Sequence, residues 1–195
     1  KSVTISQRSE NYGLPRNITG GVSDIVERFG RVIVLEDDLI TSPYFLRYMN
    51  DALDLYQNDE QVMHISGYMF PIDSAGFPET FFYNQASCWG WGTWARAWKY
   101  FRFDAQVLYD ELKSTGKLDY FMIDGTNPGF LEQLNNNING KRTTWAIKWQ
   151  ASVTLNNGLC LHSSRSLVQN IGLDGSGENS RSSGRFTVTL SDAPV

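Results

Sequence analysis

Three consecutive carboxylates, Glu36, Asp37 and Asp38, follow the apolar run at 32–35. Adjacent carboxylates repel one another, and partial burial raises their pKa values unless a cation or hydrogen-bond donors compensate. Hard oxygen ligands suit Mg²⁺ or Mn²⁺, which usually keep several waters and bridge to substrate phosphates. Because side chains alternate along an extended segment, we expect Glu36 and Asp38 to face one way and Asp37 the other. Such a site could hold a metal ion and also accept hydrogen bonds from sugar hydroxyls.

A second interpretation is a solvated acidic loop that caps the helix expected to start near Pro43. The apolar strand in front of the acids favours a functional site, because ligands of open α/β sheets bind beyond the carboxyl ends of the strands. Loops at such positions commonly carry function. The residues alone leave both interpretations open.

The flanking pattern alternates helices and strands. The segment 17–29 has apolar residues at helical spacing, and Gly30 predicts its end. The run 31–38 lacks polar alternation, which is typical of a parallel strand covered on both faces. We therefore predict an α/β fold in one domain, 1–195, with a mixed, mostly parallel sheet flanked by helices. Further strands are expected at 3–5, 61–70, 81–86, 159–164 and 166–171, and further helices at 43–58, 92–101, 104–114 and 143–158.

The composition argues against several classes of protein. The chain has 195 residues, of which 41% are hydrophobic and 19% charged, and these values suit a globular core. Its net charge of −4 argues against a nucleic-acid partner. We expect no transmembrane segment, because no run of about 20 apolar residues occurs.

Three segments together resemble GT-A-fold glycosyltransferases, above all N-acetylglucosaminyltransferase I and related bacterial sugar transferases. LEDD at 35–38, followed by SPYF at 42–45, resembles the family's metal-binding acidic motif. CWGWGTW at 88–94 resembles a Gly-aromatic segment that packs near the sugar and acceptor end of the cleft. WAIKW at 145–149, leading to SLVQNIG at 166–172, resembles the helix-plus-strand ending of the bacterial relatives. The likeness runs from about Asn11 to Gly177.

The resemblance implies an activity and a cofactor. A hexosyl or N-acetylhexosaminyl group would pass from a nucleotide diphosphate sugar, most simply a UDP-sugar, to a hydroxyl of a carbohydrate or glycoconjugate. Asp38 would bind Mn²⁺ or Mg²⁺, and Glu36 and Asp37 would accept hydrogen bonds from the donor sugar and ribose. His162 is a further candidate metal ligand, although a core histidine is the simpler interpretation. The segment's candidates for binding sugar or acceptor are Trp89, Gly90, Trp91 and Gly92.

This sequence departs from the family in two places. Thr143 and Thr144 stand where the family has an acidic pair that supplies a general base, so the base is sought elsewhere. The family's opening strand–helix units precede the segment that corresponds to 2–13. The resemblance therefore implies a fragment without the nucleotide-binding part, inactive alone and able to self-associate through an exposed sheet edge. Weak candidates for the base are Asp124, Asp174 and Glu178.

A competing hypothesis is a non-catalytic carbohydrate- or partner-binding module with a relict acidic motif. The threonines at 143 and 144 favour this module, whereas retention of all three acids favours the transferase. A metal-dependent phosphoester hydrolase would need further Asp or His ligands at other strand ends, and the sequence offers no convincing set.

Overall fold

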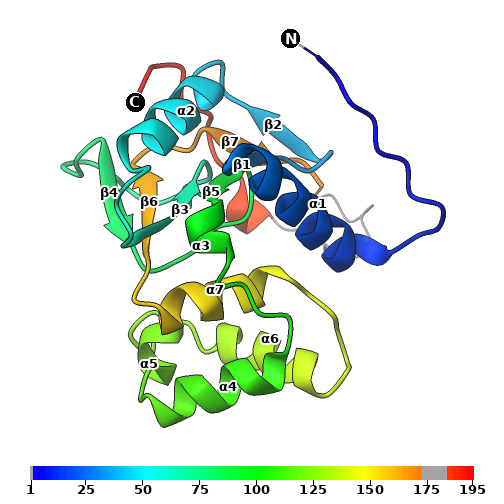
Figure 1. Cartoon of the computed structure of the whole chain (residues 1–195). Coiled ribbons are helices and arrows are strands. Elements are labelled where there is room, and N and C mark those ends of the chain that lie inside the picture. The colour runs from blue at the N-terminus through cyan, green and yellow to red at the C-terminus, as the bar shows by residue number, and fades with distance from the viewer. Residues whose placement is uncertain (1, 173–183) are drawn as a thin grey trace.

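The structure is a computed structural model that describes residues 2–172 and 184–195. Its main sheet has five strands, and a two-stranded ribbon lies beside it (Figure 1). In spatial order the main sheet contains β1 (Arg31–Val34), β5 (Trp91–Trp94), β3 (Val62–Ser66), β6 (Leu159–Ser163) and β4 (Thr80–Tyr83). The ribbon pairs β2 (Leu39–Thr41) with β7 (Val168–Asn170).

The α/β class and the mixed sheet are confirmed, but the prediction of a mostly parallel sheet is wrong. Among the described strands, β3–β6 is parallel and the other neighbouring pairs are antiparallel. The run at β1 lacks polar alternation because both its faces are covered, whatever the direction of its neighbour. Ile33 packs on one side of the sheet, and Val32 and Val34 pack on the other.

Helices cover the two faces of the sheet and form two cores. The first core lies against α2 (Phe45–Leu55). The second lies against α1 (Gly13–Phe29), α3 (Ala95–Trp98) and α7 (Ala146–Leu155). A third core joins α7 to a helical layer below the sheet in Figure 1, made of α4 (Ala105–Ser114), α5 (Leu118–Phe121) and α6 (Gly129–Ile138). Helix α7 therefore belongs to both the sheet layer and the helical layer.

Local signals placed two element ends correctly. Gly30 ends α1 with a positive φ of 77°, a left-handed conformation that glycine adopts without steric cost. Asp104 caps α4, and its carboxylate accepts the N–H groups of Gln106 at 2.9 Å and Val107 at 3.1 Å. Helix α2 begins at Phe45, two residues after the expected start, and α7 is shorter at both ends than the predicted helix 143–158.

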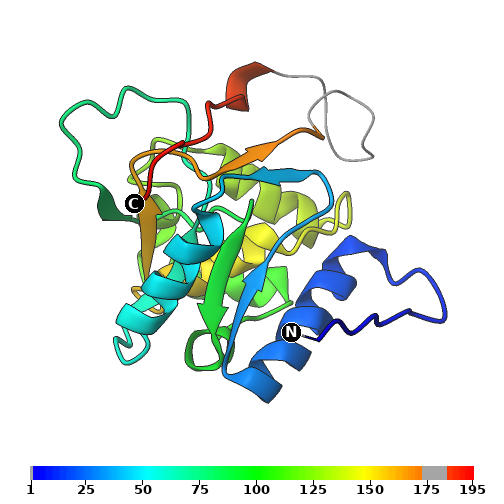
Figure 2. The ribbon, with the colours of Figure 1, turned by 90° about the horizontal axis from the view of Figure 1, so that it is seen from above.

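Two predicted elements are wrong. Residues 3–5 form no strand, and Val3 and Ile5 are 90% and 89% exposed in an arm that extends beside α1, away from the sheet (Figure 2). The predicted helix 92–101 is a strand, β5, followed by the four-residue helix α3. Trp91 and Trp94 mimic helical spacing, but strand alternation sends Trp91 into the second core and Trp94 into the first.

The last residues of the chain pack back over the sheet. A short 3-10 helix, η1 (Gly184–Phe186), leads into this tail. The Ser42 hydroxyl donates to the carbonyl of Ser191 at 2.7 Å, and the N–H of Val188 donates to the Gln169 side chain at 2.7 Å. The tail thereby joins the start of α2 to strand β7.

Two observations bear on the expected partners. No helix in the described ranges has both the length and the apolar character needed to cross a bilayer. Strands β1 and β4 are the two outer strands of the described sheet, and an outer strand presents backbone groups to a further chain. Self-association through such an edge stays a prediction.

Candidate functional site

The acidic loop and the predicted sugar-binding segment lie at one edge of the main sheet. Strands β1, β3 and β6 run in the same direction, so their carboxyl ends meet where β5 begins. Val34 pairs with Trp91, which pairs in turn with Ser66. The loop that leaves β1 at 35–38 and the segment 85–90 before β5 therefore lie at the same edge.

Glycines allow these loops to approach closely. The Gly67 N–H donates to the Gly90 carbonyl at 2.7 Å, and a Cβ at position 67 would lie 2.6 Å from that oxygen. Gly90 has a φ of 64°, and a Cβ there would lie 2.6 Å from Val168. At Gly92, on β5, a Cβ would lie 3.3 Å from the Val32 carbonyl. Gly90 and Gly92 thus serve backbone packing.

The exposures of the three acids alternate. Glu36 and Asp38 are partly buried, and Asp37 is exposed. A turn follows, in which the Leu39 N–H donates to the Glu36 carbonyl at 3.3 Å. The two partly buried carboxylates, Glu36 and Asp38, are therefore the ones whose negative charge needs a cation or hydrogen-bond donors nearby.

Asp38 is held through one carboxylate oxygen. Its Oδ2 accepts the side-chain amide of Asn170 at 3.3 Å, and its backbone carbonyl accepts the Ile171 N–H at 2.9 Å. Its Oδ1 is buried and has no hydrogen-bond partner among the described residues. Buried acceptors are nearly always satisfied, so an orphaned carboxylate oxygen indicates a place for a ligand such as a cation.

Glu36 is an acid with an altered pKa. Burial, and then the charges of Asp38 and Asp37, raise the pKa of Glu36 to about 7. At neutral pH this side chain is therefore present both as a carboxylic acid and as a carboxylate. A proton donor and a proton acceptor are both available at the same position.

The raised pKa of Glu36 predicts a pH-dependent stability. Between about pH 4.5 and 7 the folded chain holds a proton that the unfolded chain has released. The free energy of unfolding must then fall as pH rises through that window. Glu36→Gln should remove this slope, so its melting temperature should exceed that of wild type more at pH 8 than at pH 5, in EDTA. The exposed Glu10→Gln is the matched control, and equal slopes for wild type and Glu36→Gln would contradict the prediction.

Asn170 fixes the orientation of the Asp38 carboxylate. Its Oδ1 accepts the Gly172 N–H at 2.8 Å, so its amide nitrogen must face Asp38. A Cβ at Gly172 would lie 2.5 Å from Asp38 Oδ2, so the chain passes directly over the carboxylate. The role of Asn170 was missed from the sequence, although an Asn side chain commonly accepts the backbone N–H two residues later in a side-chain turn.

Removing the Asn170 amide should loosen Asp38. We expect Asn170→Ala to weaken Mn²⁺ binding by about 10-fold or more, because partners of metal ligands commonly contribute 10–100-fold. Titration calorimetry measures the effect. Asn58→Ala, at an exposed asparagine before β3, should leave the affinity unchanged. An equal loss in both variants would refute a specific role for Asn170.

His162 lies away from the acids. It sits on β6, and strands β5 and β3 separate β6 from β1. Its Nε2 is 2.8 Å from the Gln85 carbonyl, and burial lowers the pKa of His162 to about 4. Among residues 2–172 and 184–195, no group of three or more His, Cys, Asp or Glu side chains could hold a metal. An ion held by one carboxylate and by substrate phosphates does not require such a group.

The predicted sugar-binding segment is divided between core and surface. The Trp91 ring is fully buried and stacks on His64 and Trp145, each at 5.3 Å between ring centroids. Trp89 is half-buried and lines a pocket of about 270 Å³. Trp89, rather than Trp91, therefore offers a face to a ligand.

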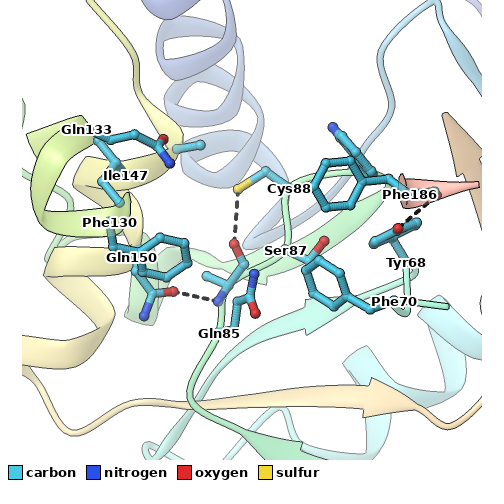
Figure 3. Close-up of a pocket in the computed structure, with 13 residues that line it drawn as sticks. Tyr68, Phe70, Gln85, Ser87, Cys88, Phe130, Gln133, Ile147, Gln150 and Phe186 are labelled. Atoms are coloured by element: carbon cyan, nitrogen blue, oxygen red, sulfur yellow. Dashed lines mark hydrogen bonds between the residues drawn. The ribbon is translucent and has the colours of Figure 1, made fainter. Parts of the chain in front are cut away.

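The pocket lies between the sheet and the helical layer. It is enclosed by the segment 85–89, by helices α6 and α7 and by the tail at Phe186 (Figure 3). Burial, and then the charge of Glu36, raise the pKa of Cys88 on the pocket wall. Glu36 is therefore close enough to this wall to act on it electrostatically. The pocket's aromatic lining, mostly missed from the sequence, comprises Tyr68, Phe70, Trp89, Phe130 and Phe186.

Of the three candidates for a general base, Asp124 lies within the described residues. Asp124 is exposed in the turn after α5, with a positive φ of 52°, and its charge acts on Tyr83 and Tyr120. Thr144 exchanges two hydrogen bonds with the Asn137 side chain, each at 2.8 Å. Asp174 and Glu178 lie outside the described residues.

No protein-family model matches this chain, and no curated protein matches it.

Proposed function

We propose that the chain is a metal-dependent glycosyltransferase of the GT-A fold, which transfers a sugar from a UDP-sugar to a hydroxyl of a carbohydrate or glycoconjugate. One observation carries the proposal: the Asp38 carboxylate stands beyond a strand end, with one oxygen anchored and the other buried and without a hydrogen-bond partner among residues 2–172 and 184–195. A pocket lined by the segment 85–89, at the same edge of the sheet as the acidic loop, is of a size to hold a sugar ring and supports the proposal.

The donor set fits Mn²⁺ or Mg²⁺. Asp38 would hold the ion through Oδ1, a hard oxygen ligand to which no described residue donates a hydrogen bond. When bound, such an ion neutralises charge on a leaving diphosphate. Asn170 keeps the Asp38 carboxylate in one orientation, so that little of the binding free energy is spent on ordering it.

The other two acids suit hydroxyl groups. Asp37 is exposed and can accept hydrogen bonds from a ribose. Glu36, with a pKa near 7, can donate a proton to a sugar oxygen or accept a hydrogen bond from a sugar hydroxyl. In this proposal the exposed Asp37 binds a ribose, and the partly buried Glu36 exchanges a proton or a hydrogen bond with the sugar.

A non-catalytic sugar-binding module is the second candidate. It is favoured by Thr144, whose side chain is committed to Asn137 at a position where the resemblance expects an acid. None of the described residues that line the pocket is a carboxylate. Glycoside binding without any Mn²⁺-dependent binding of UDP would favour the module.

The test is calorimetry of the chain with UDP, in Mn²⁺ and in EDTA. We expect UDP to bind in Mn²⁺ and to lose its affinity in EDTA, because the diphosphate would reach Asp38 only through the ion. ADP and GDP serve as comparisons for base selectivity. Equal UDP affinity with and without Mn²⁺ would refute the metal-dependent site.

A further inference from the structure

On the side of the sheet, the pocket wall is formed by four aromatic rings, those of Tyr68, Phe70, Trp89 and Phe186. Tyr68 meets Trp89 edge-to-face at 4.7 Å between centroids, and Trp89 meets Phe186 at 5.9 Å. Phe70 closes the cluster at 5.2 Å from Tyr68. The Tyr68 hydroxyl donates to the Phe186 carbonyl at 2.9 Å and so fixes the tail against this wall. Rings that brace one another in this way present a rigid apolar face.

The opposite wall is formed by α6 and α7 and supplies neutral polar groups. Figure 3 shows Gln133 and Ile147 across the segment 85–88 from Tyr68 and Phe70. Gln150 is committed to the backbone, because its Oε1 accepts the Ala86 N–H at 2.6 Å and its amide donates to the Asn84 carbonyl at 2.7 Å. The amides of Gln133 and Gln85 and the hydroxyl of Ser87 can each donate and accept.

Charge is absent from the lining. None of the described residues that line the pocket is Asp, Glu, Lys or Arg. Arg185 lies over the Phe186 ring at 5.6 Å but does not line the pocket. Burial and then the negative charges of Glu36 and Cys160 raise the pKa of Cys88 on the pocket wall, so the electrostatic influence on this residue is negative. An anion entering here would lose hydration without meeting a cation, and that loss is costly.

We propose that this pocket binds one uncharged pyranose ring and excludes anionic sugars such as uronic acids. The inference rests on the proposed function and names the sugar class for it. The volume of about 270 Å³ lies just below the range of about 300–1,000 Å³ that drug-sized ligands occupy, so it suits a single ring. The apolar face of the ring packs on the aromatic wall, and its hydroxyls meet Gln85, Ser87 and Gln133.

Pairs of neutral and anionic glycosides test directly whether the pocket excludes anionic sugars. Ligand-observed NMR titrations in EDTA compare the methyl glucoside, galactoside and mannoside with the corresponding methyl uronides, which differ by a carboxylate at C6. We expect at least one neutral glycoside to bind with a Kd on the order of millimolar, typical for a small ligand. Its uronide should bind at least tenfold more weakly. Equal affinities within each pair, or no binding by any neutral glycoside, would overturn the proposal.

Two variants locate the binding. Gln133 is exposed on α6, so Gln133→Trp should fold normally and fill the pocket, which abolishes glycoside binding. Gln61→Trp places the same side chain at an exposed position at the other end of β3 and should leave binding unchanged. Unchanged binding in Gln133→Trp would overturn the assignment. Because the titrations use EDTA, they report on the pocket alone, whereas the Mn²⁺–UDP titration reports on Asp38.

Discussion

Replacement of Asp38 by alanine should raise the Kd for Mn²⁺ by at least about 100-fold. Asp38 is the acid whose orphaned oxygen is buried, and removal of that oxygen deletes the ligand itself. The loss corresponds to about 2.7 kcal/mol, since each tenfold change in affinity is about 1.4 kcal/mol. Electron paramagnetic resonance of free Mn²⁺ measures the affinity without a substrate.

Asp37→Ala is the matched control for charge. It removes an equal negative charge one residue away, but from an exposed side chain. Its effect on Mn²⁺ should stay within a few-fold, whereas its effect on UDP should be larger because Asp37 is the proposed ribose contact. Equal weakening of Mn²⁺ binding by both variants would show that the loop attracts the ion by charge alone, and would end the assignment of Asp38 as its ligand.

Replacement of Trp91 by alanine should lower the free energy of unfolding by about 3–5 kcal/mol, the usual range for a buried Trp or Phe. The ring is fully buried among the rings of His64, Trp98, Trp145 and Trp149. A chain of this length loses about 2–4 °C in Tm per kcal/mol. Tm should therefore fall by roughly 10 °C.

Trp89→Ala provides the comparison. This ring is half-buried at the pocket, so its loss should lower stability less than loss of Trp91 and should weaken glycoside binding more. Urea denaturation followed by circular dichroism measures both variants. If Trp91→Ala kept wild-type stability, the ring would not be part of the core, and its place as a possible sugar contact would return.

Features that depend on a few neighbouring residues could be predicted from the sequence. Gly30 and Asp104 satisfy backbone needs within their own turns, so their roles as helix ends are legible locally. The acidic loop was predicted for a similar reason: the apolar run and the three carboxylates are contiguous. The segment 118–138 was missed because α5 has four residues and α6 carries three consecutive asparagines, and asparagine is a weak helix former.

Features that depend on distant pairing could not be predicted. The direction of β5 between β1 and β3 depends on which strands meet, and an apolar run carries no information on that. In and just before the expected helix 92–101, the residues Trp91, Trp94 and Trp98 follow helical spacing by coincidence across a strand–helix junction. Asn170 meets Asp38 only because β2 pairs with β7, which brings Leu39 opposite Asn170.

The long sequence separations of these contacts set an order of assembly during synthesis. Asp38 leaves the ribosome 132 residues before Asn170, and Ser42 precedes its acceptor Ser191 by 149 residues. The acidic loop is therefore made 132 residues before the side chain that orients its carboxylate. A product of premature termination would carry all three acids, and yet the ribosome would have released it before the partner that positions them had been made.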